Sequence, residues 1–279
     1  MPARLPAHFL SHGGGPWPYM KDQLGGKFDK LEASLLNLRR EIDEAPRAVL
    51  VVSGHWEEPE FTVSAAEWPP MIYDYHGFPE HTYRIKYGAP GSPALAARVQ
   101  AMLKSGGIPC VSDPARGFDH GTFSLMKPIY PNADMPIVQL SLQAGYDPEL
   151  HIQAGRLLKP LRDEGVLIIG SGLSYHNLRQ WGVSAAQPSR AFDAWLQETL
   201  LASSPAERVK RLIEWTSAPF ARAAHPREDH LLPLMTAVGA AEDEPAAVVY
   251  HEDDFMGSIA TSSFRFGQIA EGASGSQPN

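Results

Sequence analysis

The chain has 279 residues, of which 43% are hydrophobic and 20% charged, a composition typical of a soluble globular protein and not of a fibrous or disordered one. Its formal net charge of -8, without any run of Lys or Arg, excludes nucleic acid as an expected partner. Cys110 is the only cysteine, which excludes an intrachain disulfide and a cysteine-based metal cluster, and the longest apolar runs are too short to span a bilayer, so we expect a cytoplasmic protein without a membrane partner.

Short apolar or β-branched runs alternate along the chain with segments of helical spacing. In chain order, the predicted elements are strand Leu5–Leu10, helix Asp22–Asp43, strand Ala48–Val52, helix Ser92–Ser105, strand Ile137–Leu142, helix Pro148–Glu164, strand Val166–Ile169, helices Ser189–Ala202, Glu207–Thr216 and Glu228–Val238, and strand Ala246–Tyr250. Such alternation predicts an α/β fold with a single domain, in which a mixed, mostly parallel β-sheet is flanked by helices on both faces.

Three predicted helices begin with a recognisable cap. Ser92, Asp147 and Ser204 each precede a proline, the pair typical of an N-cap and the first helical position. Two stretches, Glu57–Gly91 and Ser217–Arg227, resist assignment, and long ordered loops in a compact domain are usually functional. We expect one domain over residues 1–270 and a disordered tail over residues 271–279, because the tail has nothing apolar to bury.

Histidines follow three of the predicted strands. His12 comes after the first strand, His55 after the second and His176 after the fourth, each with Gly or Ser neighbours. Side chains beyond the carboxyl ends of parallel strands converge on one crevice, and His230, near the start of a helix, is placed to face it as well. Although a single such histidine is more often structural, the repetition favours a shared site. Imidazole donors suit Zn, Cu, Fe and Ni, so the pattern predicts a metal site.

The remaining histidines and two tryptophans carry weaker indications. His120 lies in a turn between glycines, beside Asp119, which is equally well interpreted as a cap or turn residue. Trp17 and Trp56, next to His12 and His55, are candidates for the walls of an aromatic pocket. No convergent context marks the other six histidines, which we expect to be structural or at the surface: His8, His76, His81, His151, His225 and His251.

A rival interpretation rests on the glycine run. Residues 12–15, His-Gly-Gly-Gly, resemble the oxyanion-hole motif of some esterases, so a metal-dependent or serine hydrolase is the alternative function. A serine hydrolase of this kind needs a G-x-S-x-G elbow, and the sequence Gly170-Ser171-Gly172 has the wrong spacing. Neither glycine run fits a phosphate-binding motif. A non-catalytic binding protein is the third class.

Eight motifs occur together in this chain. They are SHGGGP around His12, VVSGHW around His55, PPMIYDYHGFP, YGAPGSPALA, GFDHGTF around His120, MPIVQLSL, GSGLSYHNLR around His176 and HPREDHLLPL around His230. In this order they resemble the class III extradiol ring-cleavage dioxygenases, and within them the DOPA 4,5-dioxygenase-like branch. The resemblance runs from about Leu5 to Gly267, so it covers nearly the whole chain and identifies residues 1–270 as the catalytic domain.

The resemblance implies a reaction and a set of roles. A non-haem Fe(II) would cleave a catechol-type ring with O2 to a ring-opened semialdehyde, and zinc would occupy the site in some purified samples. His12, His55 and His230 would be the metal ligands. His176 would be the acid/base histidine and a further metal contact when zinc replaces iron. His120 would be a second catalytic histidine, which polarises or orients the substrate or O2.

Three points stay open at the level of sequence. Relatives that cleave protocatechuate use two histidines and a glutamate, so Glu228 is the fallback for the third ligand. The particular catechol depends on loop residues in the two unassigned stretches. A homo-oligomer is compatible with the sequence, which does not set the oligomeric state.

Overall fold

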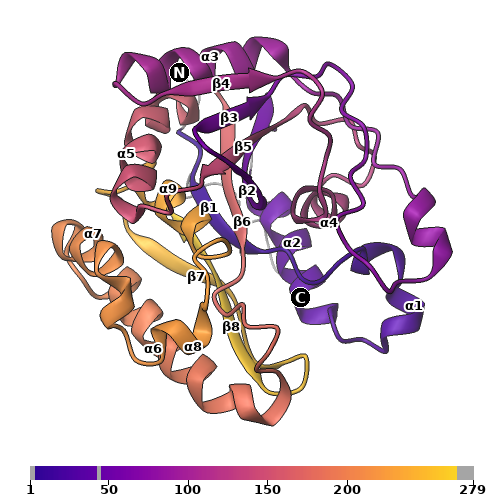
Figure 1. Ribbon diagram of the computed structural model, residues 1–279, viewed down its shortest axis with the longest axis vertical. Coiled ribbons are helices and arrows are strands. Elements are labelled where there is room, and N and C mark those ends of the chain that lie inside the picture. Colours follow the sequence, from indigo (N-terminus) through magenta and orange to yellow (C-terminus); the bar gives the residue numbers. More distant parts are fainter. Residues whose placement is uncertain (1–3, 43–44, 269–279) are drawn as a thin grey trace, which may run out of the picture.

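The structure is a computed structural model that describes residues 4–42 and 45–268 (Figure 1). In these residues a single sheet has eight strands in the order β4-β3-β5-β2-β6-β1-β8-β7. The strands are β1 Ala7–Ser11, β2 Ala48–Glu58, β3 Phe61–Ser64, β4 Cys110–Asp113, β5 Ile137–Gln143, β6 Val166–Gly172, β7 Ala246–Phe255 and β8 Ile259–Phe266. The predicted tail, residues 271–279, lies outside the described residues.

The centre of the sheet is parallel and its flanks are antiparallel. β5, β2, β6 and β1 run in the same direction, whereas β3 pairs antiparallel with β5 and β8 pairs antiparallel with β1 and β7. In the register, Ser11 of β1 lies beside Gly172 of β6, and Ser53 of β2 lies beside Ser171 of β6. The carboxyl ends of these three strands therefore meet at one edge, and the predicted mixed, mostly parallel sheet is confirmed.

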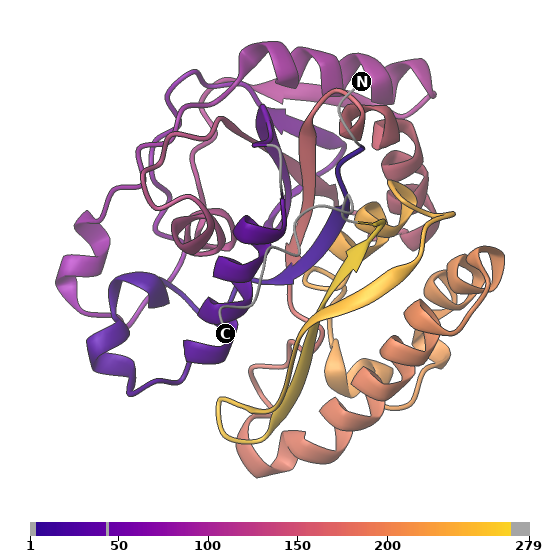
Figure 2. The same ribbon diagram turned by 180° about the vertical axis from the view of Figure 1, so that it is seen from behind.

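Helices cover both faces of the sheet, as predicted. The α-helices are α1 Lys21–Leu24, α2 Asp29–Glu41, α3 Pro93–Ser105, α4 His120–Ile129, α5 Pro148–Leu158, α6 Ala186–Leu201, α7 Pro205–Ile213, α8 Ala221–Ala224 and α9 Leu232–Gly239. Short 3-10 helices are η1 Trp17–Tyr19, η2 Glu80–Arg84, η3 Lys159–Arg162, η4 Gly182–Ala185 and η5 Trp215–Ser217. α2 and α4 lie on one face, and α3, α5, α9 and α6 lie on the other (Figures 1 and 2). None of the described helices is long and apolar enough to cross a membrane.

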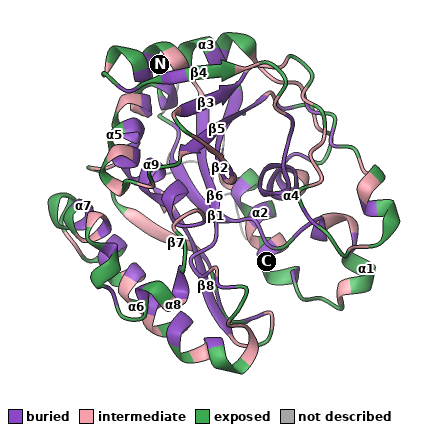
Figure 3. Ribbon diagram, viewed as in Figure 1, coloured by how far each residue is buried: buried purple, intermediate pink, exposed green. Residues whose placement is uncertain are grey.

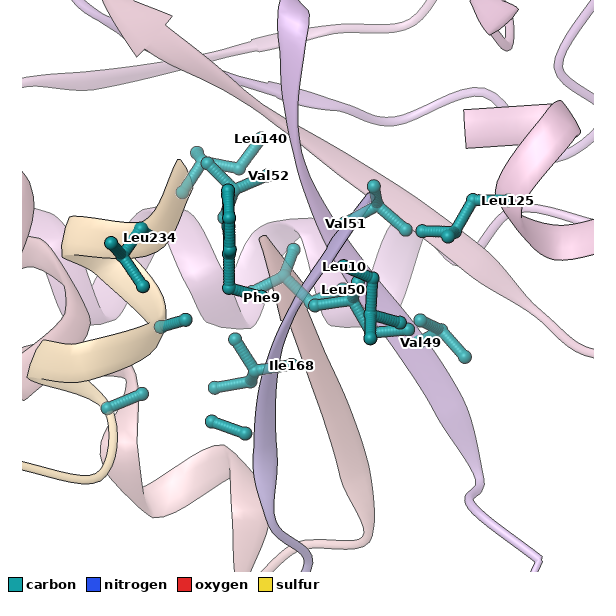
Figure 4. Packing of buried hydrophobic residues seen from close by; sticks show 14 of the residues in the cluster. Phe9, Leu10, Val49, Leu50, Val51, Val52, Leu125, Leu140, Ile168 and Leu234 are labelled. Atoms are coloured by element: carbon teal, nitrogen blue, oxygen red, sulfur yellow. The ribbon is translucent and has the colours of Figure 1, made fainter. Parts of the chain in front are cut away.

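The core lies on both faces of the central strands, which are buried along their length (Figure 3). Val52 of β2 lies beside Leu140 of β5, and both face Leu234 of α9, while Val51 points the opposite way toward Leu125 of α4 (Figure 4). Because both faces are covered, the first half of β2, Ala48–Val52, is a continuous apolar run and does not alternate with polar residues. Each fully buried Val or Leu contributes about 1.5–3 kcal/mol to folding.

The three predicted caps are all present. The side chains of Ser92, Asp147 and Ser204 accept hydrogen bonds from backbone N–H groups in the first turns of α3, α5 and α7. These contacts satisfy donors that have no partner inside a helix.

Several boundaries differ from the prediction. The predicted helix Asp22–Asp43 is divided into α1 and α2, because Gly25 and Gly26 adopt positive φ angles of 57° and 78°. The helix predicted from Pro148 ends at Leu158 and continues as η3, and the helix predicted from Glu228 begins only at Leu232.

Candidate metal centre

Three imidazole rings converge at the carboxyl edge of the sheet. His12 follows directly on β1, and its Nε2 lies 3.3 Å from Nε2 of His55. His55 lies inside β2, which extends to Glu58 and does not end at Val52 as predicted. His230 lies in the turn before α9, with its Nε2 3.1 Å from Nε2 of His55. The three nitrogens that face one another come from three separate parts of the chain.

Strand glycines allow the His230 segment to lie directly against the sheet. A Cβ atom on Gly172 of β6 would lie 2.2 Å from the carbonyl oxygen of His230, and one on Gly170 would lie 2.2 Å from that of Pro233. On β2, a Cβ at Gly54 would lie 3.0 Å from the Asp229 carbonyl. Only glycine allows so close an approach. The N–H of Leu173 then donates to the His230 carbonyl at 3.2 Å, which fixes the segment.

The three rings are in the state that binds metals. Burial, reinforced by the neighbouring imidazoles, holds the pKa of His12 and His230 well below the usual range, and burial lowers the pKa of His55 to about 3. All three are therefore neutral at pH 7, so lone pairs meet where their nitrogens converge. Neutral imidazoles ligate divalent metals such as iron and zinc. The residues present thus fit a divalent cation.

Two carboxylates contact the outer nitrogens of these rings. Asp229 Oδ2 lies 2.9 Å from Nδ1 of His230, and Asp74 Oδ2 lies 3.3 Å from Nδ1 of His55. Asp74 Oδ1 also lies 2.9 Å from Nδ1 of His120 and accepts a hydrogen bond from its backbone N–H. Burial raises the pKa of Asp74, but the contacts with His120 and His55 outweigh it and hold that pKa below its usual value. Such carboxylate–histidine contacts orient a metal-binding ring.

Sequence reasoning did not identify these two aspartates. Asp74 lies two residues before His76, and Asp229 immediately precedes His230. An aspartate next to a predicted ligand was an available indication for Asp229. The partners of Asp74, His55 and His120, are distant from it in sequence. The only indication for Asp74 in the sequence was its place in the PPMIYDYHGFP motif.

His176 and His120 lie on the same cavity as the three converging rings. The ring of His176 stacks on that of His230, with centroids 3.4 Å apart and an interplanar angle of 18°. Its Nδ1 lies 4.0 Å from Asp229 Oδ2, and its backbone N–H donates to the Ala224 carbonyl. Burial lowers the pKa of His176, while the Asp229 carboxylate opposes that shift. All five histidines proposed from the sequence are brought together.

The surroundings of His120 differ from the prediction. His120 is the first residue of α4 and not part of a turn, and Asp119 is the N-cap, whose carboxylate accepts from the Thr122 N–H at 3.0 Å. Asp119 also accepts hydrogen bonds from Ser53 and Arg116, at 3.0 and 2.7 Å. This buried network connects the start of α4 to β2, so it fixes His120 relative to His55.

The pocket walls also differ from the prediction. Trp17 stacks on Phe28 and donates its indole N–H to the His12 carbonyl, and Trp56 packs against the Arg116 guanidinium, so neither lines the cavity. A different tryptophan, Trp181, does.

The cavity has a volume of about 390 Å³, a size that suits a small aromatic molecule. Beyond the histidines and aspartates, its walls are mostly apolar: Phe28, Phe78, Leu178, Trp181, Phe255 and Met256.

Two alternatives from the sequence lose support at this cavity. Its lining, within the part of the chain that the structure describes, includes no Ser, Thr or Cys, so the His-Gly-Gly-Gly loop has no adjacent nucleophile for a serine hydrolase. Glu228 does not line it either. Its carboxylate pairs with Arg222 at 2.7 Å, which leaves His230 as the third converging residue.

Of the six histidines expected to be structural or at the surface, His76 alone contributes to the lining.

Comparison with known proteins identifies the family. Residues 6–266 match the family described as the catalytic LigB subunit of aromatic ring-opening dioxygenase. The chain belongs to this LigB family. The LigB-family chain is 38% identical over 263 residues to 4,5-DOPA dioxygenase extradiol of Beta vulgaris, covering 92% of this chain and 95% of the relative. It is 36% identical over 270 residues to the protein of the same name from Escherichia coli (strain K12), covering 95% of each.

A solved structure has a similar fold. The crystal structure of an uncharacterized protein from Escherichia coli K12 superposes with a TM-score of 0.76 at 32% identity, covering 95% of this chain and all of that one. The resemblance stated from the motifs is thereby confirmed, as is the fold class. The LigB-family chain is an extradiol dioxygenase, a class that takes a small aromatic substrate and O2. The family is metal-dependent, and two groups of side chains in the described residues could hold an ion, each with ligand atoms within 4.8 Å of one another: His12, His55 and His120, and His176, Asp229 and His230.

Proposed function

We propose that this chain is a non-haem Fe(II)-dependent dioxygenase that opens a catechol-type ring with O2 to give a ring-opened semialdehyde. The observation that carries the proposal is the convergence of three neutral imidazole nitrogens, spaced 3.1 and 3.3 Å along the cluster, on a cavity with aromatic walls. Three protein donors leave coordination positions open for reactants, as catalysis requires.

In this proposal His12, His55 and His230 hold Fe(II). When bound, the iron supplies positions for both catechol oxygens and for O2 and allows charge to pass between them. The Asp229 and Asp74 carboxylates keep the rings of His230 and His55 oriented, because each contacts the Nδ1 atom that faces away from the cluster.

His176 would move the proton. Its Nδ1 is directed at Asp229, so its Nε2 is the atom available to take a proton from a catechol hydroxyl as a general base and to return it later. Burial favours the neutral ring, which is the form a base requires. Stacking on His230 keeps the ring beside the bound substrate.

His120 would orient the substrate or O2. Its Nδ1 contacts Asp74 at 2.9 Å, which leaves Nε2 for a hydrogen bond on the cavity side. Because Asp74 also contacts His55, movement of one ring is coupled to the other.

The proposal is tested by anaerobic reconstitution with Fe(II), followed by addition of O2 and a panel of catechols. DOPA belongs in the panel because several relatives are named for it. We expect a new visible absorbance from the ring-opened product with iron and none with zinc, because zinc cannot activate O2 by redox chemistry. Full activity with zinc would contradict the dioxygenase and favour a metal-dependent hydrolase.

The proposal includes a cytoplasmic location and no nucleic-acid partner. Both are supported by composition, because the chain has one cysteine and a net charge of -8.

A further inference from the structure

The charged side chains that line the cavity are acidic. Apart from the histidines, they are Asp74 and Asp229, and neither Lys nor Arg lines it within residues 4–42 and 45–268. The remaining residues of the sequence, 1–3, 43–44 and 269–279, contain no Lys or Arg either. An anionic substituent on a bound ring would therefore meet no cationic side chain in this lining.

The nearby arginines already have partners. Arg227 pairs with Glu57 and donates to the Tyr146 hydroxyl, and Arg222 pairs with Glu228 at 2.7 Å. Breaking such a pair to bind a substrate carboxylate would only exchange one anion for another. Exposed Arg179, which follows Leu178 in the chain, does not line the cavity. Arg116 does not line it either, although it donates to the His55 carbonyl at 3.4 Å, and it pairs with Asp119.

The donors that remain on the lining are uncharged. The Tyr75 ring lines the cavity, but its hydroxyl donates to the Thr82 carbonyl at 2.5 Å. The other neutral donors on the lining are the Trp181 indole N–H, the exposed His76 ring and the backbone of Gly13–Gly15, besides the His120 and His176 rings to which the proposed function gives roles at the reacting atoms.

The apolar side chains of the cavity lining are held in place by their neighbours. Phe28 stacks on buried Trp17, and Phe255 packs edge-on against Phe28. Leu178 projects from a loop that Asn177 holds in place, because the Asn177 amide donates to the Ala223 carbonyl at 2.8 Å and accepts from the Arg179 N–H. Leu178 is 72% exposed, which places an apolar side chain in water at the mouth.

We propose that the substrate is a catechol whose ring substituent is uncharged and apolar, and not a catechol acid. This inference rests on the proposed function and specifies its substrate. A carboxylate moved from water to this wall would lose hydration without gaining a cation, whereas an alkyl, aryl or ester group would bury apolar surface against aromatic rings.

A matched pair of catechols tests the inference: 3,4-dihydroxyphenylpropionate and its methyl ester, which share the ring and the chain and differ in charge. With the iron-loaded enzyme we expect kcat/KM to be roughly ten- to a hundred-fold higher for the ester, since partial loss of hydration by an unpaired carboxylate costs one or two powers of ten in affinity. The difference should appear in KM, because the substituent is remote from the reacting atoms.

Binding is measured separately from chemistry by calorimetry on zinc-loaded enzyme under argon, which is expected not to turn the substrate over. The ester should bind more tightly by the same factor. If the ester binds more tightly but the iron enzyme opens neither ring, the proposed function fails, and only the preference of the cavity for an uncharged substituent stands. If the acid binds and reacts as well as the ester, the inference is overturned and the proposed function stands.

Variants at the mouth test the physical cause. Leu178→Arg adds a cation beside the wall, and the control Leu178→Gln removes the same apolar side chain but stays neutral. The ester-to-acid ratio should be at least several-fold lower in Leu178→Arg than in Leu178→Gln. His76→Phe and Arg179→Gln should leave the ratio unchanged. A selective loss of the acid substrate in either of these two variants would show that a side chain of this protein binds the carboxylate, and would overturn the proposal.

Discussion

The His230 ring is held on three sides. Asp229 contacts its Nδ1, the His55 Nε2 lies 3.1 Å from its own Nε2, and the His176 ring covers one face. Glu228, two residues away and the other candidate for the third ligand, pairs with Arg222. A ring fixed in this way needs little reorganisation to bind an ion, which is the property expected of a ligand.

The first prediction concerns the ligands. His12→Ala, His55→Ala and His230→Ala should each lose stoichiometric iron, because a site reduced to two imidazoles binds Fe(II) too weakly to retain it. The matched control is Glu228→Ala, which should keep its iron. Metal analysis after gel filtration decides the matter, and the assignment is wrong if the control loses iron while His230→Ala retains it.

The second prediction separates proton transfer from metal binding at His176. His176→Phe keeps an aromatic ring for stacking on His230 but has no nitrogen. We expect it to retain most of its iron and to bind catechol, yet to turn over roughly 10²–10⁴-fold more slowly, the usual cost of losing a general acid/base. Parallel loss of iron and activity would make His176 chiefly a ligand, and unchanged turnover would remove it from the mechanism.

At the scale of the elements, the ends of β2 and β6 determine where the His230 turn can lie. Glycines at positions 54, 170 and 172 present bare backbone to residues 229–233. A glycine also allows close packing on α4, where a Cβ on Gly121 would lie 2.8 Å from the His55 ring. The site is therefore assembled by close backbone approach as well as by side-chain contacts.

The third prediction tests this approach. In Gly172→Ala the added methyl would lie 2.2 Å from the His230 carbonyl, so the turn must move. We expect a loss of about 1–3 kcal/mol in unfolding free energy, the usual cost of overpacking, together with weakened iron binding. Gly88→Ala is the control, because a Cβ there meets nothing within 4 Å. Wild-type stability and iron affinity in Gly172→Ala would contradict this account of how His230 is positioned.

The central elements of the fold were accessible from sequence, because β1, β2, β5 and β6 are largely buried and each contains a short, mostly apolar run. β8 was missed because its polar residues, among them Ser262 and Ser263, are buried by partners that only the tertiary structure supplies. α4 was missed because Gly121 and Pro128 interrupt its sequence.

In the site, too, residues that depend on tertiary contacts could not be found from the sequence. The histidines that follow predicted strands were identifiable from the sequence, whereas Asp74 was not, since its two imidazole partners are brought to it by different elements. Trp17 and Trp56 were misassigned for a related reason. Adjacency to a histidine in sequence does not set the direction of a side chain, and alternate residues of a strand face opposite sides.

At the scale of the whole molecule, burial of neutral histidines makes stability depend on pH. His151 of α5, remote from the metal centre, is fully buried, with Nδ1 2.7 Å from the Asp147 carbonyl and Nε2 3.3 Å from the Gln143 backbone N–H. Burial lowers its pKa to about 4, against the opposing effect of the Asp147 carbonyl. The Nε2 atom already accepts a hydrogen bond, so protonation there would also cost that contact.

The fourth prediction follows from this histidine. Between pH 6.5 and about 4 the unfolded chain binds a proton at His151 and the folded chain does not, so the stabilisation is complete above pH 6.5 and is lost as the pH falls toward 4. Other titrating groups contribute to wild type and variant alike and cancel in the difference. In urea unfolding at pH 7 and pH 5, His151→Gln should therefore lose less stability than wild type, by about 1–2 kcal/mol. His81→Gln, at an exposed position, should match wild type in this comparison. Equal losses in wild type and His151→Gln would show that His151 takes up its proton without unfolding, and that its buried hydrogen bonds do not hold it neutral.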